Sequence, residues 1–249
     1  MIDLHSHVLP GLDDGARDVE EAVEICRAAA ADGIEVLAAT PHVRRDYPTT
    51  PEQMETALAR VREAAGGVVR LVPGGELALD ELDRPPEELR RFGLAGNPRY
   101  LLVETPYYGW PLDVSERLFR LRAAGITPVL AHPERNAEIQ ARPELLEGPV
   151  AAGTLVQLTA ASVDGRLGRA SRVAAERLLE LGHAHLIASD AHAPTLRAIG
   201  MSGAARALGD DALARWLTDG VPRAILDDGP IPARPQAVRR GGWLSRLRG

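Results

Sequence analysis

The 249-residue chain contains no lysine, so arginine supplies all 29 of its basic side chains. Without lysine there can be no lysine Schiff base and no Gly-Lys-Ser/Thr ending of the common phosphate-binding loop. There is also no lysine that carbamylation could turn into a bridge between two metal ions. The absence excludes Schiff-base enzymes, nucleotide-binding proteins with that loop, and binuclear metallohydrolases that use a carbamylated lysine.

Cysteine is nearly absent as well, because Cys26 is the single thiol and an internal disulfide framework is excluded. The sequence around Cys26 has a helical pattern and no glycine-rich phosphate loop, so we expect a buried residue and not a phosphatase nucleophile. No Gly-x-Ser-x-Gly nucleophile elbow occurs in the chain. The sequence therefore predicts no covalent catalysis by cysteine or serine.

The formal net charge of −6 argues against a general binder of nucleic acids or anionic membranes. Both of those associations depend on basic side chains that neutralise phosphate groups. No apolar run approaches the length of a membrane span, and no signal peptide is visible. Together with the lone cysteine, these features predict a cytoplasmic protein with no nucleic-acid partner and no integral membrane segment.

Aromatic residues make up only 4% of the chain, so the core must consist of Leu, Val, Ile and Ala, as is typical of helices on parallel strands. Short apolar runs predict seven strands, at 1–5, 35–40, 69–76, 100–105, 127–132, 154–159 and 185–190. Helical patterns that end near glycine lie at 18–33, 51–67, 114–125 and 169–182. This alternation predicts an α/β fold and favours a closed or slightly distorted (β/α) barrel over an open sheet, although periodicity leaves closure open.

Most of these predicted strands end beside a histidine or a carboxylate. The residues are His5, His7, His42, Glu76, Glu104, His132, Asp190 and His192. Because the carboxyl ends of barrel strands form one face, we expect these side chains to converge in one pocket. Histidine nitrogens mixed with carboxylate oxygens suit Zn, Mn or Fe, whereas Mg and Ca prefer oxygen alone. With Asp14 the ligands number nine, which is too many for one ion and about right for three.

His183 and His185 repeat the H-x-H spacing of His5 and His7, but they precede a predicted strand instead of following one. In a parallel barrel this position belongs to the opposite face. We therefore predict that His183 and His185 are surface or helix-end residues outside the metal site.

The segments HSHVLPGLDDG, ATPH, GGE, LLVETP, AHPER and SDAH resemble the successive motifs of the PHP (polymerase and histidinol phosphatase) superfamily. More narrowly, the first and last of these, with HPER and QLTAASVDG, resemble the manganese-dependent protein-tyrosine phosphatases of bacterial capsule and exopolysaccharide systems, the CpsB/CapC type. The resemblance implies a distorted seven-stranded (β/α) barrel of PHP type. We expect a single PHP domain over 1–249 with a flexible basic tail from about residue 233.

The resemblance also implies three metal ions per chain, of manganese or otherwise of iron, zinc or cobalt. The first ion would be held by His5, His7, Glu76 and Asp190. Glu76 would also reach a second ion, held by Glu104 and His132. The third ion would be held by Asp14, His42 and His192, although Asp13 stands beside Asp14 and the choice between the two is less secure.

Two arginines match positions where this family binds phosphate. They are Arg135 of HPER and Arg197 of APTLR. A guanidinium group can hold two phosphate oxygens at once, which fits the role that the resemblance implies.

The resemblance implies a metal-dependent phosphatase that hydrolyses phosphotyrosine on a protein. The expected substrate is a bacterial tyrosine kinase that regulates capsule or exopolysaccharide synthesis. The same metal core also suits a small-molecule phosphoesterase of the histidinol-phosphate-phosphatase type. A PHP module that binds partners without turnover is a third alternative, weakened because no expected ligand is missing. The oligomeric state is not predicted.

Overall fold

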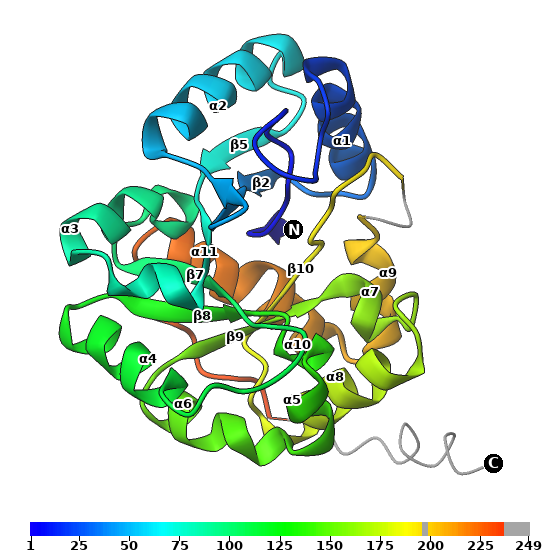
Figure 1. Ribbon diagram of the computed structural model, residues 1–249. Coiled ribbons are helices and arrows are strands. Elements are labelled where there is room, and N and C mark those ends of the chain that lie inside the picture. Colours follow the sequence, from blue (N-terminus) through cyan, green and yellow to red (C-terminus); the bar gives the residue numbers. More distant parts are fainter. Residues whose placement is uncertain (196–198, 237–249) are drawn as a thin grey trace.

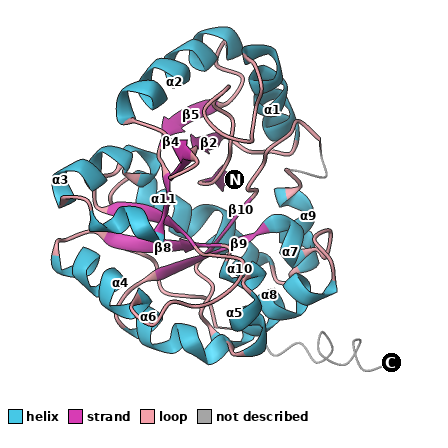
Figure 2. Cartoon of the chain, viewed as in Figure 1, coloured by secondary structure: helices cyan, strands magenta, loops and turns pink. Residues whose placement is uncertain are grey.

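The computed structural model describes residues 1–195 and 199–236, and its strands form two sheets (Figures 1 and 2). The smaller sheet is parallel and consists of β1, β2 and β5 in that order, with bounds Ile2–Asp3, Val36–Ala39 and Arg70–Pro73. The larger sheet has the order β10-β9-β8-β7-β6-β3-β4, with bounds Leu186–Ala188, Leu155–Thr159, Thr127–Ala131, Tyr100–Glu104, Glu76–Ala78, His42–Arg44 and Tyr47–Pro48. Its pairs are parallel except for the antiparallel pair of β3 with β4.

Two short stretches of chain connect the smaller sheet to the larger one. One stretch runs from β2 into β3 and the other from β5 into β6, and β2 pairs with β5 as β3 pairs with β6. In the second stretch a Cβ on Gly75 would lie 2.9 Å from Cδ1 of Phe92, so only glycine fits there without a shift. A parallel bridge between Ser6 and Ala191 then joins the segments that follow β1 and β10. The pairing therefore leads from β1 through both sheets to β10 and back to β1.

Helices cover the outside of the sheets, with α1 and α2 beside the smaller sheet and α4, α6 and α8 beside the larger one (Figure 1). Their bounds from α1 to α6 are Val19–Ala31, Pro51–Ala65, Pro86–Leu89, Val114–Ala123, Ala137–Ala141 and Glu147–Ala151. Those from α7 to α11 are Ala160–Val163, Arg169–Leu181, Met201–Ala207, Asp211–Arg215 and Val221–Leu226. The four helices predicted from the sequence are α1, α2, α4 and α8.

Local chemistry sets the ends of α2. Thr50 and Gln53 form a capping box at its start, each side chain accepting a hydrogen bond from the backbone N–H of the other. Gly66 ends the helix in the left-handed region, at a φ of 59°. These signals are short-range, and for that reason the sequence predicts this helix closely.

All seven predicted strands are present, but the run 69–76 is divided into β5 and the start of β6. The hairpin of β3 and β4 was not predicted. The hairpin begins at the candidate ligand His42, where pairing with β6 decides the backbone conformation more than local pattern does.

The core is apolar and includes the Cys26 thiol, which is fully buried as expected. In residues 1–195 and 199–236 no helix has the length and hydropathy needed to cross a membrane. Most of the basic tail predicted to be flexible falls in 237–249, outside the described residues. Just before it, Arg234 donates hydrogen bonds to the carbonyl oxygens of Leu179 at 2.7 Å and Ala184 at 3.4 Å.

Candidate metal centre

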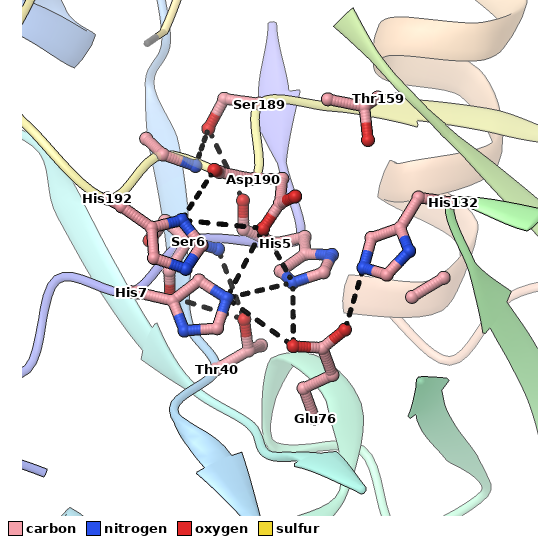
Figure 3. Close-up of polar contacts among 12 residues, drawn as sticks. His5, Ser6, His7, Thr40, Glu76, His132, Thr159, Ser189, Asp190 and His192 are labelled. Carbon is pink, nitrogen blue, oxygen red and sulfur yellow. Dashed lines mark hydrogen bonds and ion pairs between the residues drawn. The ribbon is translucent and has the colours of Figure 1, made fainter. Parts of the chain in front are cut away.

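The carboxyl ends of the strands bring all nine predicted ligands into one cluster. Their donor atoms form four overlapping groups, each spanning no more than 4.8 Å: His5, His7 and Asp190; His5, Glu76 and His132; His42, Glu76 and Glu104; His7, Asp14, His42 and His192. Figure 3 shows the side chains of His5, His7 and Glu76 directed toward a common centre with Asp190. Residues far apart in sequence thus meet, as the parallel arrangement of strands predicts.

Two nitrogens at the middle of the cluster lie close to two carboxylate oxygens. His5 Nε2 lies 3.2 Å from His7 Nε2, and each of these atoms lies 3.3–3.4 Å from Glu76 Oε2 and 3.3 Å from Asp190 Oδ1. The nitrogens thus form a nearly equilateral triangle with either oxygen. With edges of about 3.3 Å, the centre of such a triangle lies about 1.9 Å from each corner, close to the length of a zinc–nitrogen or zinc–oxygen bond, about 2.0–2.2 Å. Each triangle of donor atoms therefore fits one metal ion.

Glu76 links these central atoms to the rest of the cluster. Its side chain is fully buried, and its Oε1 lies 3.0 Å from His132 Nε2. Its Oε2 lies 2.9 Å from Nδ1 of His42, which is 3.7 Å from Oε2 of Glu104. One carboxylate between several histidines is the arrangement that bridges two metals.

The remaining ligands lie toward the pocket entrance. Asp14 Oδ1 lies 3.6 Å from His42 Nε2 and 3.4 Å from His192 Nε2. The His192 ring stacks on the His7 ring with centroids 3.9 Å apart. The side chain of Asp14 is half exposed, so this group is the one most open to solvent.

Asp13 has a different role from Asp14. Asp13 Oδ2 accepts hydrogen bonds from His7 Nδ1 at 2.8 Å and from the backbone N–H of His42 at 2.9 Å. Its Oδ1 accepts from the backbone N–H of Gly15 at 2.9 Å. Asp13 therefore orients His7 from behind, and Asp14 faces the cluster. His5 has a comparable support, since its Nδ1 lies 2.9 Å from Oε1 of Gln157.

Two candidate ligands have left-handed backbones, which ordinary residues rarely adopt. His132 has a φ of 39° and Asp190 a φ of 55°. The N–H groups that hold them are bonded across strands, from His132 to Gln157 O and from Asp190 to His5 O, both at 2.9 Å. Such backbone strain, of order 1–3 kcal/mol per residue, is concentrated at functional sites.

The electrostatics of the cluster favour a cation. Although burial opposes protonation, the negative charges of Glu76 and Asp190 raise the pKa of His5 to about 9. Burial likewise opposes protonation of His7, but its hydrogen bonds to Asp13, Asp190 and Glu76 hold its pKa well above the usual value. The buried carboxylates thus gather positive charge onto these two histidines, and a metal ion can replace those protons.

Among the buried side-chain atoms that lack hydrogen bonds within the described part of the chain, two face each other in the cluster. They are His42 Nδ1 and Glu76 Oε2, whose 2.9 Å contact does not have hydrogen-bond geometry. Leaving such atoms without a partner is costly, and metal bound in the cluster would supply one. The residues present therefore fit bound metal on geometry, on charge and on unmet bonding capacity.

A pocket of about 400 Å³ opens over the cluster and is lined in part by Arg135, Arg44 and Tyr107. The Arg135 guanidinium forms an ion pair with Asp190 and donates to the Tyr107 hydroxyl at 2.8 Å. Arg44 donates to Oε1 of Glu104 at 2.9 Å. Arg197, the second arginine of the prediction, falls outside the described residues.

Sequence reasoning did not identify Arg44, yet a signal was present. Arg44 follows His42 by two residues in β3, and alternate residues of a strand face the same side. Two tyrosines also cover ligand histidines: the Tyr107 ring lies parallel to His132 within 2°, and the Tyr47 ring lies within 12° of His42.

His183 and His185 lie outside the ligand groups, as predicted from their place before a strand. His183 follows the end of α8. His185 differs from the prediction, because it is half-buried with its ring centroid 6.2 Å from that of Trp216. Burial lowers its pKa to about 4.

A family model described as capsular polysaccharide synthesis, CpsB/CapC, matches residues 1–217. The chain belongs to this family. The match covers every candidate ligand and Arg135, and it confirms the family resemblance read from the motifs.

Relatives and a solved structure agree with the family. The tyrosine-protein phosphatase YwqE of Bacillus subtilis is 36% identical over 205 residues, which cover 77% of each chain. The tyrosine-protein phosphatase CpsB of Streptococcus pneumoniae is 27% identical over 203 residues, covering 77% of this chain and 83% of that protein. A crystal structure from a study of YwqE and CpsB, described as unique metal-dependent tyrosine phosphatases, superposes with a TM-score of 0.84 at 30% identity and covers 96% of this chain and 100% of its own.

Proposed function

We propose that this protein is a metal-dependent protein-tyrosine phosphatase. The observation that carries the proposal is the close set of donor atoms from His5, His7, Glu76 and Asp190, beneath a pocket that contains Arg135. The family supports the same activity, because CpsB/CapC relatives are named tyrosine-protein phosphatases and the similar solved structure is described as metal-dependent.

The cluster has enough donor atoms for three ions. On the family pattern we assign His5, His7, Glu76 and Asp190 to the first ion, Glu76, Glu104 and His132 to the second, and Asp14, His42 and His192 to the third; all nine belong to the four overlapping groups of donor atoms. The mixture of nitrogen and oxygen donors supports manganese, or else iron, zinc or cobalt. When bound, such ions lower the pKa of coordinated water toward ~7 and withdraw charge from a phosphoryl group.

The chain itself binds and orients the phosphoryl group. Asp190 and the Tyr107 hydroxyl hold the guanidinium of Arg135 at the pocket, where it can grip two phosphoryl oxygens. Negative charge on those oxygens must be stabilised during transfer, so a fixed guanidinium assists the transition state. Arg197 shares this role in the proposal, on the basis of the family pattern. A phenolate leaving group, with a pKa of ~10, requires little help from a general acid.

An aromatic substrate suits the pocket better than an aliphatic one. The Tyr107 ring is 45% exposed, lines the pocket and lies parallel to the His132 ring. A phosphotyrosine ring can stack on such an exposed face.

We further propose that the closed path of strand pairing forms a distorted seven-stranded (β/α) barrel of PHP type in one domain. The physiological substrate in this proposal is a bacterial tyrosine kinase that regulates capsule or exopolysaccharide synthesis, in keeping with the family's description. A cytoplasmic location fits the buried, unpaired Cys26.

A substrate panel tests the activity. Protein loaded with Mn²⁺ should hydrolyse phosphotyrosine peptides with a kcat/KM at least tenfold above that for matched phosphoserine peptides and for histidinol phosphate. A preference for histidinol phosphate would favour the small-molecule phosphoesterase. Absence of turnover on every member of the panel, with three metals bound, would favour a binding module.

A further inference from the structure

Thr159, the last residue of β9, has a buried hydroxyl group that none of the roles above uses. The residue is 2% exposed and lines the pocket. Its Oγ1 has no hydrogen-bond partner in residues 1–195 and 199–236. A buried hydroxyl without a partner is unfavourable, so one that lies unpaired at the wall of a pocket indicates a ligand that completes its bonding.

The strand sets the direction of this side chain. Residues two apart on a strand face the same side, and Gln157 faces the ligand cluster because its Oε1 lies 2.9 Å from His5 Nδ1. Thr159 therefore faces the same side, one step closer to the end of the strand. Figure 3 shows its hydroxyl directed toward the space between Asp190 and His132.

The backbone of Thr159 is fixed by the segment that carries Arg135. The Thr159 N–H donates a hydrogen bond at 2.9 Å to Oε1 of Glu134, the fully buried neighbour of Arg135 in the sequence. On its other side, Thr159 is in register with Ala188 of β10, two residues before Asp190. The hydroxyl is thus held in position relative both to the guanidinium and to the ligands.

We propose that Thr159 is a phosphate-binding residue, whose hydroxyl donates a hydrogen bond to a phosphoryl oxygen of the substrate. The inference rests on the proposed phosphatase function, since it assigns a contact to the phosphoryl group. An oxygen of a phosphate dianion is a strong acceptor, and a hydroxyl that has no protein partner is free to donate to it.

Thr159→Val tests the contact, because valine keeps the shape of threonine and removes the hydroxyl. In Mn²⁺-loaded protein, kcat/KM for a phosphotyrosine peptide should fall by about 10-fold to 100-fold. The dissociation constant of inorganic phosphate, measured by calorimetry without turnover, should rise at least about fivefold. Thr159→Ser, which restores the hydroxyl, should recover most of both losses. The metal content should equal that of the wild type.

Stability separates this role from a structural one. Valine replaces an unpaired hydroxyl by a methyl group, so the Thr159→Val variant should unfold at the same temperature as the wild type or higher. A threonine that only supported the fold would give a lower unfolding temperature together with the lower activity, and that result would contradict the proposal.

Thr154 offers a matched control. It immediately precedes β9, is 1% exposed, and its Oγ1 also lacks a partner among the described residues. Thr159 lies five positions further along the strand, a distance of about 17 Å. Thr154→Val should change neither the kinetics nor the affinity for phosphate.

The outcomes distinguish the two proposals. Thr159→Val with kinetics and phosphate affinity within twofold of wild type, or Thr154→Val with equal losses, would refute the role of Thr159. If the proposed function is wrong, the wild-type protein will not hydrolyse phosphotyrosine. In that case the phosphate titration can still compare the phosphate affinities of the variants. Wild-type protein that neither turns over substrate nor binds phosphate would overturn both.

Discussion

Replacing Asp13 by asparagine should weaken metal binding although Asp13 is not itself a ligand. The carboxylate uses both oxygens, Oδ2 for His7 and the His42 N–H and Oδ1 for the Gly15 N–H. Asparagine has a single acceptor oxygen, and its NH₂ group would face a donor at the other position. Either His7 or the loop at Gly15 must then lose its partner, and the His7 ring becomes less well oriented.

The expected loss is about 10-fold to 100-fold in metal affinity, or about 1.4–2.7 kcal/mol, the usual cost of removing a group that orients a ligand histidine. Asp13 also contributes separately to the stability of the fold. Burial opposes ionisation of Asp13, but its hydrogen bond and charge interaction with His7 lower its pKa from 3.8 to about 2. That difference of nearly two units corresponds to about 2 kcal/mol of folding stability.

The sign of this contribution fixes the pH of the experiment. A carboxylate whose pKa is lower in the folded protein stabilises it fully above the unfolded value of 3.8 and loses the effect as the pH falls toward 2. Measurements at pH 7 therefore record the whole effect. Titration of metal-free protein with Mn²⁺, followed by activity and by calorimetry, should show that Asp13→Asn needs about 10-fold to 100-fold more metal for half-maximal response.

Saturation with metal separates Asp13 from its neighbour. At saturating Mn²⁺ the Asp13→Asn variant should recover a kcat within a few-fold of wild type, because its ligands are intact. Asp14→Asn, which alters a proposed ligand near His42 and His192, should keep a low kcat at any concentration. If Asp14→Asn were rescued by metal and Asp13→Asn were not, the two roles would be reversed.

Further predictions concern metal, arginine and a buried histidine. Chelation should abolish activity and Mn²⁺ should restore it; full activity in protein shown by elemental analysis to be metal-free would refute the centre. Arg135→Lys keeps the charge but loses the planar fork, so kcat/KM should fall about 10-fold to 100-fold at unchanged metal content. Unchanged kinetics would show that Arg135 does not bind the phosphoryl group. Burial raises the pKa of Glu104 and the charge of Arg44 opposes that rise, so Arg44→Leu should move the acidic limb of the pH–rate profile to higher pH; an unmoved limb would count against this coupling. Because burial lowers the pKa of His185 from 6.5 to about 4, the neutral form stabilises the fold above pH 6.5 and the effect declines toward pH 4. Between pH 7 and pH 5 the free energy of unfolding, measured by chemical denaturation, should therefore fall by about 1–2 kcal/mol less in His185→Asn than in wild type. Equal falls in the two proteins would contradict this role of His185.

The candidate ligands could be found from the sequence because of where they stand in it. Glu104 is the last residue of β7, His132 follows β8, and Asp190 and His192 follow β10. Strand periodicity and the shared direction of parallel strands are enough to bring such residues to one face. The same rule separated His183 and His185 from the cluster, although their spacing alone resembles that of His5 and His7.

Loop residues were less predictable, because their directions depend on distant contacts. Asp13 and Asp14 are adjacent and chemically alike, but Asp13 turns toward the backbone of His42, 29 residues away, and leaves Asp14 facing the cluster. Arg44 acquires its place through Glu104, 60 residues away. The burial of His185 depends on contact with Trp216, a residue of a later helical segment.

Local periodicity and the side-chain chemistry at strand ends were enough to predict the alternation of strands and helices and the set of candidate metal ligands. The separations among the donor atoms, the distinct roles of Asp13 and Asp14 and the unpaired state of the Thr159 hydroxyl could be seen only in the folded chain. Those properties depend on which atoms of distant segments meet, and packing between segments fixes those meetings.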